Sequence, residues 1–301
     1  MEDNDSAGWS NLTLEALVEV FRRLDFEDRY VVIPLVCKAW LGAVMEPACW
    51  ERADMEECFS TRQENSEWWS VGFERKMDVM IRAVVDRSLG RLLELRTRHC
   101  SDEAVSYAAF RCPMLQCLSV KDSSGVTDRA LCRIALTCLS LNYVDVSECR
   151  HISALSLKNL AQNCKSMSVL KRNLRPLDDD DGDWRRRSIV PRSYLQVGPS
   201  SSGDEEAIVL GTSMPNLTHL ELRHSTISDI GLSCIVKGCT KLSHLDLYGC
   251  THVSQRALHL ASECLRYLKK FVRPTSRIIT SSRYSHWQLY DERFQNRSFQ
   301  F

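Results

Sequence analysis

The chain has 301 residues, which is enough for one large domain or two smaller ones. Lys and Arg number 39 together and Asp and Glu also number 39, so the net charge of zero weakens the case for a protein that coats nucleic acid. The sequence holds no run of about eighteen apolar residues that could span a membrane. Its acidic start, Met1-Glu2-Asp3, does not look like a secretory signal peptide. We therefore expect a protein of the nucleus or cytoplasm that binds neither nucleic acid nor membrane and keeps its thiols reduced.

Residues 9–52 have the pattern of a small helical bundle. Apolar residues recur there at helical spacing, with Thr13 in position to cap the helix: Leu14, Leu17, Val18 and Phe21. Pro34 cannot lie inside a helix, so we expect it to open a further one. That helix would place three apolar residues on one face: Val36, Trp40 and Val44. So few residues bury only a small core and leave apolar surface exposed, which predicts docking on a partner.

Residues 53–86 are expected to form a helical linker that serves as an N-terminal cap, and residues 87–274 repeat at intervals of 25 or 26 residues. Each copy has a Leu-x-Leu strand, a turn, a Ser-Asp or Thr-Asp helix start and an amphipathic helix. One such unit cannot bury its own apolar face, but stacked neighbours can. The pattern predicts an α/β solenoid of about six to seven repeats.

Most of the chain's 14 cysteines fall at fixed places in this repeat, and no Cys-x-x-Cys pair occurs. Reduced cysteine packs as a small apolar residue. We therefore expect one set to be buried and reduced: Cys112, Cys138, Cys149, Cys164, Cys239, Cys250 and Cys264.

One copy is interrupted, because residues 164 and 214, which open successive copies, are 50 apart, twice the usual interval. Residues 175–203 are expected to form an inserted flexible loop, and residues 275–301 a tail. The acidic run in the insertion does not fit a calcium loop, since Leu177 and Ser188 stand where ligands are required. We expect no metal and no cofactor.

The N-terminal segment resembles an F-box. The resemblance rests on residues 12–17, on Val20-Phe21-Arg22-Arg23-Leu24, on Val36-Cys37-Lys38-Ala39-Trp40 and on Trp50. Thr13 departs from the pattern, because the family usually has proline there. Followed by cysteine-containing leucine-rich repeats, the whole chain resembles a plant F-box/leucine-rich-repeat protein of the Skp-interacting group. The resemblance implies a small all-α F-box bundle followed by an α/β leucine-rich-repeat solenoid.

The resemblance also implies a function. The chain would be the substrate-recognition adaptor of an SCF-type ubiquitin ligase, linked through the Skp adaptor to cullin and RING subunits. The matching Skp-binding positions are Leu12, Leu14, Leu17, Phe21, Leu24, Val36 and Trp40. Some of these residues, Trp40 above all, could instead fill the core of the bundle. An alternative is a repeat scaffold whose F-box acts outside a ligase.

Strand residues between the leucines should line the concave face and bind a protein substrate. One column of these positions is acidic in four of five copies: Glu94, Ser119, Asp145, Glu221 and Asp246. It predicts a negative ladder that favours a basic segment of a partner, although Asp at this slot is also common in the repeat class. The expected substrate contacts are Tyr143, Asp145, His219, Glu221, Asp246 and Tyr248.

Nothing in the sequence indicates catalysis. It has no Gly-x-Ser-x-Gly, no phosphate-cradling glycine-rich loop and no His-Glu-x-x-His. We expect a non-catalytic subunit that holds a target close to a conjugating enzyme.

Overall fold

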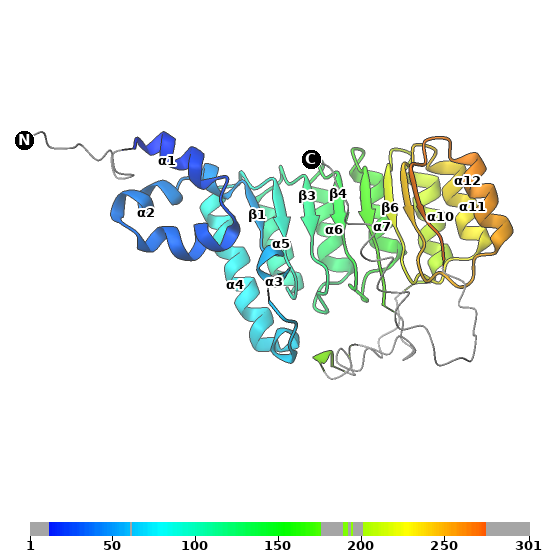
Figure 1. The fold of residues 1–301 in the computed structure, drawn as a ribbon, viewed down its shortest axis with the longest axis horizontal. Coiled ribbons are helices and arrows are strands. Elements are labelled where there is room, and N and C mark those ends of the chain that lie inside the picture. Colours follow the sequence, from blue (N-terminus) through cyan, green and yellow to red (C-terminus); the bar gives the residue numbers. More distant parts are fainter. Residues whose placement is uncertain (1–11, 61, 176–188, 192–193, 195–200, 275–301) are drawn as a thin grey trace, which may run out of the picture.

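The computed structural model describes residues 12–60, 62–175, 189–191, 194 and 201–274. A helical bundle leads into one sheet of eight parallel strands, which follow one another in chain order. Helices cover one face of this sheet, and the strands line the other (Figure 1). The predicted tail at 275–301 and most of the predicted insertion lie outside the described residues.

The bundle is built from short helices and turns. They are α1 (Leu14–Phe21), η2 (Asp28–Val32), η3 (Ile33–Leu35), α2 (Lys38–Val44) and η4 (Pro47–Trp50). Thr13 caps α1 as predicted, since its hydroxyl accepts from the Ala16 N–H at 3.3 Å. Pro34 does not open α2 but lies in the single turn η3, and α2 begins only after Cys37. Val36 is therefore outside α2 and exposed, while Val44 is fully buried, so these two residues do not share one face.

The segment between bundle and repeats is more than a helical linker. It contains β1 (Arg52–Asp54), α3 (Glu57–Ser60), η5 (Ser66–Trp69) and α4 (Val71–Ser88). Strand β1 pairs in parallel with the first repeat strand, so the sheet begins here. Asn65 and Ser70 cap η5 and α4 with their side chains.

Six strand-helix repeats and a final strand complete the described part of the sheet. Their strands are β2 (Glu94–Arg96), β3 (Cys117–Ser119), β4 (Tyr143–Asp145), β5 (Val169–Lys171), β6 (His219–Glu221), β7 (His244–Asp246) and β8 (Lys270–Val272). Their helices are α5 (Asp102–Arg111), α6 (Asp128–Thr137), α7 (Ala154–Asn163), α10 (Gly203–Ser213), α11 (Asp229–Gly238) and α12 (Gln255–Cys264). The middle residue of each strand from β1 to β7 is fully buried: Ala53, Leu95, Leu118, Val144, Leu170, Leu220 and Leu245. The predicted α/β solenoid is confirmed.

An aspartate ladder links neighbouring helices, because an aspartate of one helix binds the serine or threonine that caps the next. The carboxylate of Asp102 accepts from the N–H and hydroxyl of Thr127 at 2.7 and 2.5 Å. The same double contact recurs in four other pairs: Asp78 with Ser101, Asp128 with Ser153, Asp204 with Ser228 and Asp229 with Ser254. The ladder breaks at α7, which starts with Ala154, and there the Ala154 N–H donates to Ser201 at the end of the insertion.

The repeat cysteines fill the slots predicted for them, with one exception. All seven were expected to be buried, but Cys264 is exposed. In five other copies the slot is the C-cap residue: Cys112, Cys138, Cys164, Met214 and Cys239. Helix α12 has ten residues like α11, but it starts and ends 26 rather than 25 residues after it, so Leu265 takes the cap and the buried slot while Cys264 stays exposed.

Helices α10 and α11 pack unusually closely because glycine faces glycine. A Cβ atom on Gly238 would lie 1.5 Å from the carbonyl oxygen of Gly211, and a Cβ on Gly211 would lie 2.2 Å from the Cys234 carbonyl oxygen. Neither position accepts a side chain without separating the helices. Among the described helices none is long and apolar enough to cross a membrane.

Candidate docking surfaces

The F-box bundle has a small aromatic core. Phe21 is buried and meets the ring of Trp40 edge to face, with centroids 5.1 Å apart. Trp50 is fully buried and donates its indole N–H to the Val44 carbonyl at 2.6 Å. Buried Arg29 donates to the carbonyl groups of Cys49 and Arg52 and so ties the bundle to β1. Burial lowers the pKa of Arg29.

Outside this core, residues 12–45 expose eight large apolar side chains, which we call the F-box apolar set. They are Leu12, Leu14, Val31, Val32, Leu35, Val36, Leu41 and Met45. Leu35 is 81% exposed, the largest value of any large apolar residue described. Such a concentration on a small bundle is typical of a protein-binding surface.

The residues predicted to bind Skp divide into two groups. Leu12, Leu14 and Val36 belong to the F-box apolar set. Leu17 and Phe21 are buried, so the prediction that they contact a partner is corrected: they support the surface from within. Leu24 and Trp40 are half-buried and pack against the core.

Five members of the F-box apolar set were missed: Val31, Val32, Leu35, Leu41 and Met45. The motif pattern drew attention to α1 and to the Val-Cys-Lys-x-Trp core instead. The run Val31-Val32-Ile33-Pro34-Leu35 was a usable signal, because so many consecutive apolar residues cannot all point into a core this small.

On the concave face, strand pairing sets side chains in two rows. The row of first strand residues is Arg52, Glu94, Cys117, Tyr143, Val169, His219, His244 and Lys270. The row of third strand residues is Asp54, Arg96, Ser119, Asp145, Lys171, Glu221, Asp246 and Val272.

This register overturns the predicted negative ladder. Glu94 pairs with Cys117 in the first row, so Arg96 takes its place beside Ser119. The interrupted copy contributes Lys171 between Asp145 and Glu221. The third row therefore contains both signs of charge. The sequence made it look acidic because the first copy was aligned two residues out of register and the copy that contains β5 was left out.

Two of the predicted substrate contacts, Asp145 and Asp246, are not available to a substrate. Asp145 is buried, accepts from the Ser147 N–H at 3.0 Å, and has its pKa raised by burial. Asp246 is fully buried, accepts from the Tyr248 N–H at 3.0 Å and pairs with Arg223 at 2.6 Å. Both aspartates hold the turn after their strand, so their assignment as substrate contacts is corrected.

The other four predicted contacts stay near the surface. The ring of Tyr143 lies between two cations, 4.4 Å from the Arg96 guanidinium and 6.0 Å from the Lys171 ammonium. Tyr248 is 36% exposed and meets His224 edge to face. His219 and Glu221 are half-buried and hydrogen-bonded to each other at 2.7 Å.

Comparison with known proteins shows the family to which this chain belongs. The F-box domain model matches residues 9–52, and a model described as the leucine-rich repeats of FBD-associated F-box protein At5g56370 matches residues 187–281. F-box protein SKIP1 of Arabidopsis thaliana is 40% identical over 97% of each chain. This chain belongs to the family of F-box proteins with leucine-rich repeats.

Further relatives of this F-box protein come from the same plant. Putative F-box/LRR-repeat protein 19 of Arabidopsis thaliana is 38% identical and covers 88% of this chain and 87% of its own. F-box protein SKIP19 is 26% identical, over 84% of this chain and 73% of its own. The predicted membership of the F-box/leucine-rich-repeat family is confirmed.

In this F-box protein one residue of the insertion is anchored between the cap and the repeats. Tyr194 is buried and donates its hydroxyl to the Glu148 carbonyl. Its ring lies against Trp69 of η5, with centroids 4.6 Å apart. Burial raises the pKa of Glu148 to about 7. The insertion thus contacts both the segment next to the F-box and the middle of the array.

Proposed function

We propose that this protein is the substrate-recognition adaptor of an SCF-type ubiquitin ligase. Its F-box would dock on the Skp adaptor, and its repeats would hold the target. The observation that carries the proposal is the F-box apolar set, in which eight large side chains of a small bundle lack cover. The names SKIP1 and SKIP19 of the relatives agree with it.

The chain would act through proximity rather than chemistry. The Arg29 contacts to Cys49 and Arg52 tie the bundle to β1, the first strand of the sheet. A target held on the sheet would then be presented at a defined distance from a conjugating enzyme carried by the cullin and RING subunits. Such tethering raises the effective concentration of the target lysine without any catalytic group on this chain.

The target would bind on the concave face, around the side chains that remain accessible. Tyr143 and Tyr248 are the aromatic anchors, and His219 and Glu221 lie between them in the array. Arg96, Lys171 and Arg223 supply positive charge beside them. We expect such a partner to offer both aromatic contact and mixed charge rather than a purely basic segment. The nucleus and the cytoplasm both remain proposed locations.

The test of the adaptor function is binding of the full-length chain to purified Skp adaptor by calorimetry. Leu35→Asp should weaken binding by at least about a hundredfold, because it buries a charge in an apolar contact. Leu136→Asp is the matched control, since Leu136 is also exposed but lies on α6. Equal affinity of the wild type and Leu35→Asp would contradict docking through this surface.

The alternative, a scaffold outside a ligase, predicts Skp binding without ubiquitin transfer. Reconstitution with cullin and RING subunits distinguishes the two. Ubiquitination of a co-purified target that depends on Leu35 supports the ligase. A stable complex of chain and Skp that excludes cullin supports the scaffold.

A further inference from the structure

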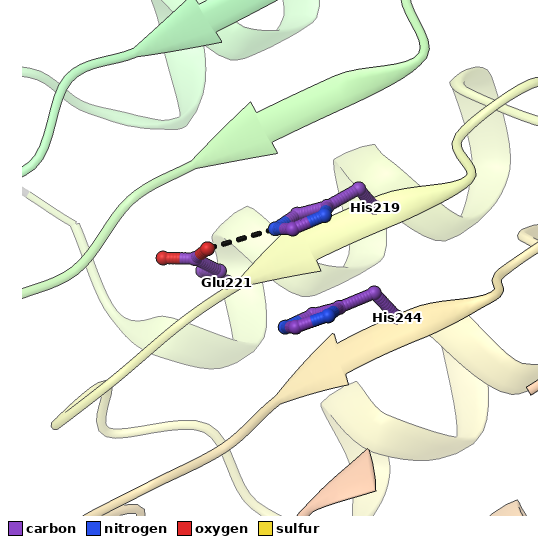
Figure 2. A group of neighbouring side chains, drawn as sticks. All are labelled: His219, Glu221 and His244. Carbon is purple, nitrogen blue, oxygen red and sulfur yellow. Dashed lines mark hydrogen bonds and ion pairs between the residues drawn. The ribbon is translucent and has the colours of Figure 1, made fainter. Parts of the chain in front are cut away.

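Two neighbouring strands of the concave face bring together three side chains that all have metal-binding atoms. His219 and Glu221 are first and third on β6, so they project from the same face of the strand. His244 is first on β7, where it is paired in register with His219. One ligand atom from each of the three side chains lies within 4.8 Å of the other two, and Figure 2 shows how the side chains are arranged.

The two imidazole rings are stacked in parallel, with centroids 4.0 Å apart and an angle of 6° between their planes. His219 hydrogen-bonds Glu221 through its Nε2 atom. The Nε2 atom of His244 is buried and has no hydrogen-bond partner among the described residues. A buried ring nitrogen without a partner requires an explanation, and an absent ligand is one.

The surroundings of the cluster shift the pKa of two of its members. Burial alone would raise the pKa of Glu221, but hydrogen bonds from Asn173 and His219 and the ion pair with Lys171 lower it to about 2. Burial, and then the neighbouring His219, lower the pKa of His244.

We propose that His219, His244 and Glu221 bind a divalent transition-metal ion of the zinc class. Two imidazoles and one carboxylate are ligands that zinc accepts, and three protein ligands leave a position open for a further donor. The site is built on strands, which fixes the spacing of its ligands. In a tetrahedral site, two atoms bound to one zinc ion lie about 3.4 Å apart. The ligand atoms, which lie within 4.8 Å of one another, therefore need to close by up to about 1.4 Å. The stacked rings also need to turn out of parallel, because an imidazole binds a metal in the plane of its ring.

Two side chains beside the site affect how readily Glu221 can bind a metal. Lys171 places its ammonium 3.0 Å from the same Glu221 oxygen that His219 contacts, so it competes with a metal for this carboxylate. Asn173 donates to the other carboxylate oxygen at 2.7 Å and orients it. Metal binding would release Lys171 into the concave face, next to Tyr143.

The experiment titrates the metal-free full-length chain with Zn²⁺ against a chromophoric chelator. We expect the wild type to bind one ion at this site, His219→Gln and His244→Gln to weaken it by at least about tenfold, and Lys171→Met to strengthen it. His259→Gln is the control, since this exposed histidine lies on α12. Circular dichroism establishes that each variant is folded, and Lys171→Met provides a test in the opposite direction if a histidine variant is not.

Cysteines are the main competitors for zinc in this chain. Co²⁺ distinguishes binding at the His219, Glu221 and His244 cluster from binding to cysteines. Thiolate ligands add intense ultraviolet charge-transfer absorption, and imidazole and carboxylate ligands do not. Site-dependent binding without this absorption supports the proposal. Identical affinity of the wild type and His244→Gln, or binding that carries only the thiolate signature, would overturn it.

Discussion

The F-box bundle and the repeat array differ in how densely they expose large apolar residues. In the array the middle residues of β1 to β7 are fully buried, and each repeat covers the next. In the bundle, eight large apolar residues between 12 and 45 are left exposed. The array also exposes apolar residues, such as Phe110, Leu136 and Ile230, but they are spread over separate helices, whereas the bundle gathers its eight within residues 12–45.

Thiol reactivity gives the largest contrast. Burial raises the pKa of Cys250 from 9.0 to about 12, which lowers its thiolate fraction near neutral pH about a thousandfold. Cys37 on the bundle and Cys264 on α12 are exposed. We expect these two to react with a bulky thiol reagent at least about a thousandfold faster than Cys250. Mass spectrometry of the labelled native chain measures this.

Adding the Skp adaptor makes the same experiment discriminate between the two exposed cysteines. Cys37 follows Val36 of the F-box apolar set, so docking should protect it and leave Cys264 reactive. Protection of neither, despite complex formation, would move the interface away from this surface.

A substitution in the core of the array should destabilise the protein, whereas a substitution on the surface of the bundle should not. Leu220→Ala removes a fully buried side chain at the centre of β6 and should lower the free energy of unfolding by about 3–4 kcal/mol. Leu35→Ala should change it by less than about 0.5 kcal/mol. Urea unfolding measures both. If Leu35→Ala proved as destabilising as Leu220→Ala, Leu35 would belong to the core and the comparison would fail.

The junction of the two regions predicts a pH effect. His99 is buried among Phe59, Trp68, Trp69 and Phe73, and burial lowers its pKa from 6.5 to about 4. Between these values the unfolded chain takes up a proton that the folded chain refuses, so stability falls as the pH drops below 6.5. The loss should reach about 2 kcal/mol at pH 5.

The difference between the wild type and His99→Gln isolates this effect. Glu148, with its raised pKa, acts in the opposite direction over an overlapping range and is common to both proteins. Urea unfolding at pH 7 and pH 5 gives the comparison. Parallel pH dependence of the two proteins would show that His99 is accessible to protons in the folded state.

The smallest effect concerns the aspartate ladder. Asp128→Ala removes two hydrogen bonds to Ser153 and should cost about 1–2 kcal/mol. Lys158→Ala, on the exposed face of α7, is the control and should be neutral. Equal stability of both variants would mean that packing alone couples the repeats.

The array could be predicted from the sequence because its period is regular. The strand centres recur at 25 or 26 residues from β3 to β5 and from β6 to β8, so one copy indicates the burial of the next. The prediction failed where the period shifts by one residue, at Cys264 and Leu265, and where a copy was aligned wrongly, at Glu94 and Arg96.

Burial in the bundle could not be predicted as well from the sequence, because both its core and its exposed surface consist of apolar residues. Leu17 and Leu35 have the same chemistry, yet one is buried and the other 81% exposed. Leu17 lies on α1 and Leu35 at the end of η3, and the sequence pattern does not distinguish the two environments. The cluster of His219, Glu221 and His244 was likewise hidden, because residues 25 apart meet only once the strand register is known.

The interruption of the aspartate ladder at Ala154 has a consequence for how such a chain can change over generations. Wherever the ladder is intact, extra residues between two helices would pull a serine or threonine away from its aspartate. Ala154 has no carboxylate that could accept from the next repeat. Instead, the hydroxyl of Ser201, which belongs to the insertion, accepts from the Ala154 N–H. This junction is therefore the place where the array accommodates additional length and new sequence at the lowest energetic cost, and where we expect family members to differ most in size.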